Sequence, residues 1–346
     1  MNWRKLLFPF SGLYWLGSSL RNVFYNIGFL KQTQFDLPII NVGNLSVGGT
    51  GKSPHVLYLI ELLKNNYKVC TLSRGYGRKS RGFKFANYES KVYDIGDEPM
   101  QFFRRFKNKI IVTVCENRVT GTQKIIRDFY PDLIILDDAY QHRSIKAGFN
   151  ILLTDYQFPY SKDYLLPAGN LRESRAGAKR ADVIIVTKCP ENLTEKNVQQ
   201  LRESLRVKPK QELFFSKIEY ATKLIGLHDE IPMSNWLNYN AVVVTGIANA
   251  QNFVAFCEEK FRAVLHLEFP DHHNFSNTEI EYIRKRYQNT EGERILLTTE
   301  KDYMRLMEEE SLKNDMYYLP ISVTLNDEKK FNELIIDYVR ENQKRS

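Results

Sequence analysis

The sequence contains few cysteines, and their spacing excludes the common metal-binding patterns. The 346 residues include four cysteines, at positions 70, 115, 189 and 257, and no C-x-x-C pair. Cysteines placed so far apart argue against a structural zinc site. They suit buried thiols in a reducing cytosol.

Two further absences concern charge and hydrophobic length. The chain carries 49 lysines and arginines and a net charge of +8, yet no run of five basic residues occurs. The net charge favours an anionic partner such as a phosphorylated substrate or an acidic membrane, whereas the scattered basic residues weaken the case for nucleic acid. No apolar run reaches the roughly 20 residues that a membrane-spanning helix needs.

The N-terminus is nevertheless unusually apolar. No charged residue occurs between Lys5 and Arg21, and aromatic residues such as Trp15 interrupt the aliphatic ones. This pattern, flanked by basic residues, is typical of a helix or hairpin that lies in a membrane surface. A signal peptide is the rival interpretation, but no small-residue cleavage site follows. A helix packed on the domain is the structural alternative. We predict a membrane-associated helical segment over residues 1–31.

A glycine-rich stretch at residues 41–54, NVGNLSVGGTGKSP, is the central motif. An apolar run at 37–42 predicts a buried strand before it, and helical spacing of apolar residues at 55–64 predicts a helix after it. Strand, glycine-rich loop, Gly-Lys-Ser and helix together form the phosphate-binding loop arrangement. The usual pattern has a glycine where this chain has Ser46. The alternative is a glycine-rich hairpin with a chance Gly-Lys-Ser.

The chemistry of this loop suits a nucleoside triphosphate. Glycines allow backbone N–H groups to face a phosphate, and the helix N-terminus adds partial positive charge. Lys52 is expected to neutralise the β- and γ-phosphates, and Ser53 to hold Mg²⁺. The predicted nucleotide-binding residues are Ser46, Val47, Gly48, Gly49, Thr50, Gly51, Lys52 and Ser53.

A pair of carboxylates ends another predicted strand. Asp137 and Asp138 follow the apolar run at 133–136, the position of the Mg²⁺-associated acid in phosphate-loop proteins. Adjacent carboxylates at a strand end need a compensating cation or hydrogen bonds, so we predict a metal environment there. An Asp pair in a turn is the alternative. His142 follows shortly afterwards as a substrate or supporting group.

Other polar residues sit at loop or helix starts. Arg74 follows a strand predicted at 68–72, where open α/β sheets bind ligands. Asp97 precedes a helix predicted at 100–106 and suits an N-cap, although an acidic group there also suits a general base. Arg118 begins a helix and faces either the site or solvent. Arg172 and Glu173 either serve a phosphate and a metal or pair on the surface.

The remaining pattern predicts an α/β fold of two units. Strands at 110–114, 150–154 and 182–187 complete a mostly parallel sheet in a nucleotide-binding domain over residues 32–208. The pattern loosens over a linker at 209–240, which contains a strand at 211–220. A smaller α/β domain follows at 241–346, with strands at 241–245, 264–269, 294–298 and 316–323 and helices at 251–260, from 277, and at 328–342.

These pieces coincide, in order, with one known family. The chain resembles the tetraacyldisaccharide 4'-kinases, which act in lipid A biosynthesis in Gram-negative bacteria. One departure is Ala139-Tyr140, where the family commonly has Gly-Phe. The matching motifs are residues 41–54, SRGYGR at 73–78, GDEP at 96–99, DD at 137–138, QHR at 141–143, LPAG at 166–169, LRE at 171–173, PDHH at 270–273 and TEKD at 299–302.

The resemblance implies a function and a location. It implies transfer of the γ-phosphoryl group of ATP, with Mg²⁺, to the 4'-hydroxyl of a tetraacylated disaccharide 1-phosphate, giving lipid IVA. It also implies two α/β/α sandwich domains, the first of the phosphate-loop NTPase type, at the cytoplasmic face of the inner membrane. Neither a nucleic acid nor an obligate protein partner is implied. A soluble kinase for another acceptor and a switch-like ATPase are the rival functions.

The resemblance also implies roles for single residues. Asp97 is expected to take the proton of the 4'-hydroxyl, and His272 to orient it; the sequence leaves open whether His272 or His273 faces Asp97. Asp138 and Glu173 are candidates for the metal environment, with Asp137 close by. Candidates for binding the substrate phosphate or the transition-state charge are Arg74, Arg118, His142 and Arg172. Because Asp97 and His272 lie in different predicted domains, domain closure is expected to assemble the site.

Overall fold

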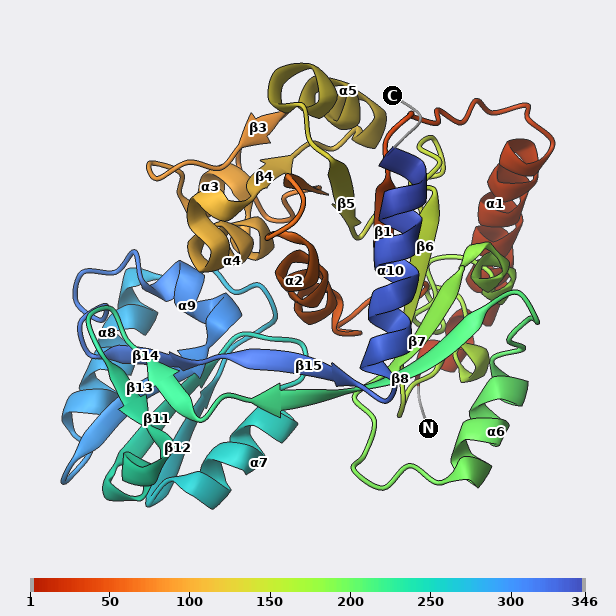
Figure 1. The fold of residues 1–346 in the computed structure, drawn as a ribbon. Helices are drawn as coiled ribbons and strands as arrows, with labels where there is room; N and C mark the ends of the chain where they lie inside the picture. The colour runs from red at the N-terminus through yellow and green to blue at the C-terminus, as the bar shows by residue number, and fades with distance from the viewer. Residues whose placement is uncertain (1–2, 344–346) are drawn as a thin grey trace.

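Two twisted sheets form the frame of the protein (Figure 1). The computed structural model describes residues 3–343, so the predicted segments 1–31 and 241–346 each extend slightly outside the described part. The larger sheet has the strand order β15-β8-β7-β6-β1-β5-β2-β4-β3. Its strands are β1 (Ile39–Asn44), β2 (Val69–Ser73), β3 (Lys84–Phe85), β4 (Ile111–Val114), β5 (Leu133–Asp137), β6 (Phe149–Asp155), β7 (Val183–Thr187), β8 (Glu212–Tyr220) and β15 (Ile321–Leu325).

The smaller sheet has the order β10-β9-β14-β13-β11-β12. Its strands are β9 (Lys223–Ile225), β10 (Glu230–Pro232), β11 (Asn240–Thr245), β12 (Ala263–Glu268), β13 (Arg294–Thr299) and β14 (Met316–Leu319). The helices are α1 (Phe8–Asn26), α2 (Lys52–Leu63), α3 (Val92–Ile95), α4 (Asp97–Phe106), α5 (Arg118–Phe129), α6 (Glu195–Ser204), α7 (Gln251–Lys260), α8 (Asn277–Gln288), α9 (Glu300–Leu306) and α10 (Glu328–Gln343).

Alternating side chains build a layer on each face of the larger sheet. In β5, Leu133 and Ile135 pack in the cluster that includes α2 and α10. Ile134 and Leu136 point to the opposite face and pack with Ile125 of α5. A strand buried on both faces reads as a continuous apolar run, which is why β5 is visible in the sequence. The smaller sheet is also covered on both faces, by α7 on one side and α8 and α9 on the other. The predicted α/β class, with helices on both faces of each sheet, is therefore confirmed.

The last strand and helix depart from the predicted domain division. The single strand predicted at 316–323 is two strands, interrupted at Pro320, whose missing N–H cannot continue a ladder. β14 stays in the smaller sheet, while β15 pairs antiparallel with β8 in the larger one. α10 then packs on the first sheet, where the Tyr338 hydroxyl donates to Ile39 O (3.1 Å). The end of the predicted domain 241–346 thus lies with the nucleotide-binding unit.

The predicted linker is more regular than its sequence suggests. Most of residues 209–240 belong to β8, β9, β10 and a short 3-10 helix. Phe214 of β8 is buried in the core between the first sheet and α10. β8 and β15 run side by side from one unit to the other (Figure 1), so the two units are joined by a strand pair.

The N-terminal segment is one helix that exposes its apolar side. α1 has Pro9 in its first turn, where proline is tolerated, and its only buried residue is Ser11. Ser11 donates to Leu165 O (3.0 Å), and Asn22 lies against the protein body. The large exposed apolar side chains of this segment are Leu6, Phe8, Phe10, Leu13, Tyr14, Trp15, Leu16, Leu20, Val23, Ile27 and Phe29. Over residues 3–343, no helix has both the length and the apolar content that crossing a bilayer requires.

Candidate active site

The glycine-rich loop joins the end of β1 to the first turn of α2. Gly48 and Gly51 have φ values of 107° and 83°, which glycine adopts without the penalty that other residues incur. The loop is held from outside: Asn44 Nδ2 donates to Thr50 Oγ1 (2.7 Å), and Lys188 Nζ donates to Gly49 O (2.6 Å). The loop backbone is therefore fixed, as a phosphate cradle requires.

A buried histidine supports the loop from below. His55, in the first turns of α2, contacts Gly51 O through Nδ1 (2.7 Å) and Ser216 Oγ through Nε2 (3.0 Å). Because a carbonyl can only accept, Nδ1 carries the proton and Nε2 accepts from Ser216. Burial lowers the pKa of His55 to about 4, against a smaller opposing effect of the Gly51 hydrogen bond. His55 is therefore a neutral link between the loop and β8.

Asp138, directly after β5, faces two cations. Arg172 donates to both its oxygens, from Nη1 (3.0 Å) and Nη2 (2.7 Å), and Lys52 Nζ lies 3.8 Å from Oδ2. Burial raises the pKa of Asp138, but Lys52 and Arg172 outweigh it and hold the pKa below its ordinary value. Its backbone is left-handed (φ 49°), a conformation that costs a non-glycine residue about 1–3 kcal/mol and is concentrated at functional sites.

Asp137 has the opposite electrostatic character. Ser73 Oγ donates to its Oδ2 (3.1 Å), while buried Oδ1 finds no hydrogen-bond partner among the residues described. Burial, Glu98 and Asp138 raise the pKa of Asp137. An unpartnered oxygen on such a carboxyl fits a nearby cation. No cluster of three or more His, Cys, Asp or Glu side chains that could hold a metal occurs within residues 3–343.

Asp97 meets His272 across the two units. The predicted capping role is wrong: the N-cap of α4 is Gly96, and Asp97 is the first helical residue, only 3% exposed. His272 Nδ1 lies 3.1 Å from Asp97 Oδ2, whereas His273 contacts Glu279 (2.9 Å). His272, and not His273, is therefore the residue that faces Asp97. Like Asp138, His272 has a left-handed backbone (φ 58°).

Two cations that the sequence reasoning missed complete this group. Arg305 donates to Asp97 Oδ2, and Lys301 Nζ lies 3.0 Å from His272 Nε2 and 3.8 Å from Asp97 Oδ2. Burial raises the pKa of Asp97, but the His272 hydrogen bond and the charges of Arg305 and Lys301 lower it below its ordinary value. The available signal was Thr299-Glu300-Lys301-Asp302 after β13: a helix starting there places positions 301 and 305 on one face.

Glu98 connects the two groups. Ser53 Oγ donates to Glu98 Oε1 (3.3 Å), and Lys301 Nζ lies 3.9 Å from the same oxygen. Glu98, which directly follows Asp97 in the chain, is therefore the residue that links the Asp97–His272 pair to the phosphate loop. A phosphate on the loop and an acceptor beside Asp97 would be neighbours.

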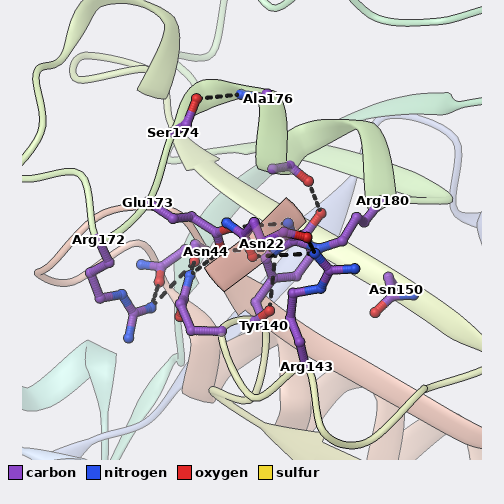
Figure 2. Close-up of polar contacts among 12 residues, drawn as sticks. Asn22, Asn44, Tyr140, Arg143, Asn150, Arg172, Glu173, Ser174, Ala176 and Arg180 are labelled. Atoms are coloured by element: carbon purple, nitrogen blue, oxygen red, sulfur yellow. Dashed lines mark hydrogen bonds and ion pairs between the residues drawn. The ribbon is translucent and has the colours of Figure 1, made fainter. Parts of the chain in front are cut away.

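Glu173 lies in a polar network with Arg180 and Asn22 (Figure 2). Its carboxylate is buried and accepts from Arg180 at both oxygens (2.8 and 2.9 Å), from Gln141 (3.0 Å) and from Asn22 of α1 (3.2 Å). With both oxygens engaged, Glu173 serves here as an ion-pair partner, and the arrangement does not support the predicted metal role. Arg172, its neighbour, points the other way, to Asp138 and Asn44.

The other predicted substrate residues lie beside the aspartates. Arg118 is buried and donates to Cys115 O (2.7 Å) and Asp137 O (3.2 Å), so it faces the site rather than solvent. Arg74 is exposed and close enough to act on His142. Burial, with Arg118 and Arg74, lowers the pKa of His142 to about 4. Their predicted contacts with substrate remain predictions.

A glycine-rich loop joins a parallel strand to a helix, Lys52 stands at the helix start, and two aspartates end the adjacent strand. These features define a phosphate-loop nucleotide-binding protein. Residues 3–340 match the model of the tetraacyldisaccharide-1-P 4'-kinase family. The chain belongs to this family, which confirms the resemblance noted from the sequence and the enzyme class, a kinase.

Relatives cover nearly the full chain. The tetraacyldisaccharide 4'-kinase of Flavobacterium johnsoniae is 46% identical over 98% of both chains. That of Bacteroides thetaiotaomicron is 40% identical, over 99% of this chain and 95% of the relative. The solved structure of LpxK from Aquifex aeolicus in complex with ATP has a TM-score of 0.77 and 32% identity, covering 97% of this chain and 99% of that one.

Proposed function

We propose that this protein transfers the γ-phosphoryl group of ATP to the 4'-hydroxyl of tetraacyldisaccharide 1-phosphate and so forms lipid IVA. The single observation that carries the proposal is the contact of Ser53 with Glu98, which brings the phosphate loop next to Asp97 and His272. Membership of the family supplies the acceptor, and a bound ATP in its Aquifex relative supports the donor.

The phosphate loop binds the nucleotide in this proposal. Backbone N–H groups of the glycine-rich loop cradle the phosphates, except those of Val47 and Thr50, which donate to Asn170 O and Gly48 O. Lys52 balances the charge that develops on the γ-phosphoryl group. Arg172, now paired with Asp138, lies close enough to this charge to share in balancing it. Ser53 and Asp138 would hold Mg²⁺, which would neutralise part of the phosphate charge.

Asp97 accepts the proton of the attacking hydroxyl. Its contacts with His272, Lys301 and Arg305 all involve Oδ2, so Oδ1 is the oxygen that a hydroxyl approaches. The 4'-oxygen forms a bond to the γ-phosphorus, the bond from that phosphorus to the β-phosphate oxygen breaks, ADP leaves, and the proton moves to Asp97. A low pKa makes Asp97 a modest base, which suffices because positioning and charge stabilisation dominate phosphoryl transfer.

The N-terminal helix attaches the protein to a membrane in this proposal. α1 turns its polar residues, such as Ser11 and Asn22, toward the protein and its apolar residues outward, the reverse of an ordinary surface helix. An acyl-chain substrate in the cytoplasmic leaflet of the inner membrane would then lie in reach of the site.

The test measures transfer of labelled phosphate. Purified protein receives γ-labelled ATP, Mg²⁺ and tetraacyldisaccharide 1-phosphate in detergent micelles, and label in the lipid is counted. Transfer is expected, with a loss of at least 100-fold in Lys52→Ala and no loss in Lys217→Ala, whose lysine pairs with Glu191 on the surface. ATP hydrolysis without labelled lipid would refute the proposal and favour the switch-like ATPase.

A further inference from the structure

We propose that Lys301 is a positioning residue that fixes the tautomer of His272 and so directs the Nδ1–H group of His272 at Asp97. The kinetic consequence rests on the proposed function, because it assumes that Asp97 accepts the hydroxyl proton. The tautomer itself follows from the contacts alone.

The first step is the pairing at Nε2. Lys301 Nζ lies 3.0 Å from His272 Nε2, and an ammonium group has donors only. Two donors facing each other at this distance would repel, so Nε2 is unprotonated and accepts from Lys301. A neutral imidazole with an unprotonated Nε2 carries its hydrogen on Nδ1.

The second step is the partner of Nδ1. Asp97 Oδ2 (3.1 Å) and Arg305 Nη2 (3.0 Å) both lie within hydrogen-bond distance. Each ring nitrogen has a cation at 3.0 Å, but only Nδ1 also has a carboxylate within hydrogen-bond distance, because Asp271 Oδ2 lies 3.9 Å from Nε2. The ring hydrogen is therefore on Nδ1 and goes to Asp97, to which Arg305 also donates. A doubly protonated ring would place three cations together on Asp97, with Glu98 and Asp271 as the other nearby acids. The neutral Nδ1–H form gives the ring hydrogen a carboxylate acceptor and gives Nε2 a donor.

The third step is the rigidity of the support. Lys301 and Arg305 stand one turn apart on α9. Buried Asp302 on the same helix accepts from Gly246 N (2.9 Å), and His272 N donates to Gly246 O (3.1 Å). The helix that carries Lys301 and the loop that carries His272 are therefore tied to the same glycine, which holds the Lys301–His272 distance fixed.

The fourth step is the consequence of losing this contact. Without a donor at Nε2, the ring is free to take the other tautomer, in which Nδ1 accepts from Arg305 and no longer donates to Asp97. Asp97 then loses one of its hydrogen bonds and its orientation. A misplacement of this kind costs about 10- to 100-fold in rate.

The experiment reads the tautomer directly. The full-length protein in detergent micelles is labelled with ¹⁵N-histidine, and the His272 signals are assigned by their loss in His272→Gln. We expect Nδ1–H in the wild type, Nε2–H or a mixture in Lys301→Met, and Nδ1–H again in Lys301→Arg, which keeps a donor. A wild-type Nε2–H form, or an unchanged Nδ1–H form in Lys301→Met, would overturn the proposal.

Kinetics supply the second readout. In the transfer assay, kcat of Lys301→Met should fall about 10- to 100-fold with an unchanged KM for ATP, and Lys301→Arg should recover most of the loss. An unchanged kcat in Lys301→Met would refute the positioning role. If the wild type transfers no phosphate, the proposed function fails, while the ¹⁵N spectra still decide the tautomer. The wild-type tautomer can be read even if Lys301→Met does not fold.

Discussion

Acid should weaken the fold through His55, the histidine beneath the phosphate loop. The side chain is 4% exposed and is held between Gly51 O and Ser216 Oγ. Burial, partly offset by the Gly51 hydrogen bond, lowers its pKa from 6.5 to about 4. As pH falls below 6.5, the unfolded chain binds a proton at this position and the folded chain does not. Stability is therefore fully present above pH 6.5 and is lost progressively down to pH 4.

The magnitude follows from the size of the shift. One pKa unit corresponds to about 1.4 kcal/mol, so the full shift of His55 amounts to about 3 kcal/mol at pH 4. Between pH 7.5 and pH 5, where most carboxylates are still ionised, the expected loss is about 2 kcal/mol. The assay is urea unfolding followed by circular dichroism at both pH values, in the wild type and in His55→Gln, which cannot gain this proton.

The comparison isolates one group. Other acids and histidines remain in both proteins, so their contribution cancels in the difference. His55→Gln should lose about 2 kcal/mol less than the wild type over this interval, whereas His228→Gln, which changes an exposed histidine, should behave as the wild type does. Equal losses in the wild type and His55→Gln would show that His55 is not held neutral in the fold.

Two further predictions concern the N-terminal helix and its support. Glu173→Gln leaves Arg180 without its buried partner and should lower the free energy of unfolding by about 3 kcal/mol, measured by urea unfolding at pH 7.5. The control Glu191→Gln, which breaks an exposed pair, should lower it by less than about 1 kcal/mol. Similar losses in both variants would contradict the buried pairing. Leu13→Asp should weaken binding to phosphatidylglycerol-containing vesicles at least about tenfold in a flotation assay. Leu237→Asp changes a similarly exposed leucine outside α1 and should leave binding unchanged. Equal binding by both variants would contradict membrane attachment through α1.

The parts of the site that the sequence predicted are local. β1, the glycine-rich loop and α2 are adjacent in the chain, and each has its own signal: an apolar run, closely spaced glycines and helical spacing. The same is true of Asp137 and Asp138, because a strand buried on both faces ends visibly where the apolar run ends. Such elements carry their structural information within about ten residues.

The parts that could not be predicted depend on distant partners. Glu173 looked like a metal ligand beside Arg172, but Arg180 and Asn22 bond to its oxygens. Asn22 lies 151 residues away, and the nearer Arg180 is in a 3-10 helix whose direction the sequence does not show. Asp97 looked like a helix cap because helix starts favour aspartate. In the structure Gly96 is the N-cap, and Asp97 is buried against Arg305, which lies 208 residues further along the chain.

The break at Pro320 has the widest consequence for the site. After β14 the chain leaves the smaller sheet, and β15 pairs with β8 in the larger one. The second unit is therefore connected to the first by two paired strands and not by a single linker. The unit between them supplies His272, Lys301 and Arg305, and the first unit supplies Asp97 and the phosphate loop. Asp97 and His272 lie in different units, so the position of one unit on the other sets the Asp97–His272 distance. The contacts across this boundary near the site, Arg305 to Asp97 and Lys301 to Glu98, are polar and centred on the proposed base. Around these polar contacts, buried apolar side chains of α4 and α9, such as Phe103 and Met304, belong to one core cluster that joins the units. The support of Asp97 therefore depends on this junction, and a change that separates the units removes it.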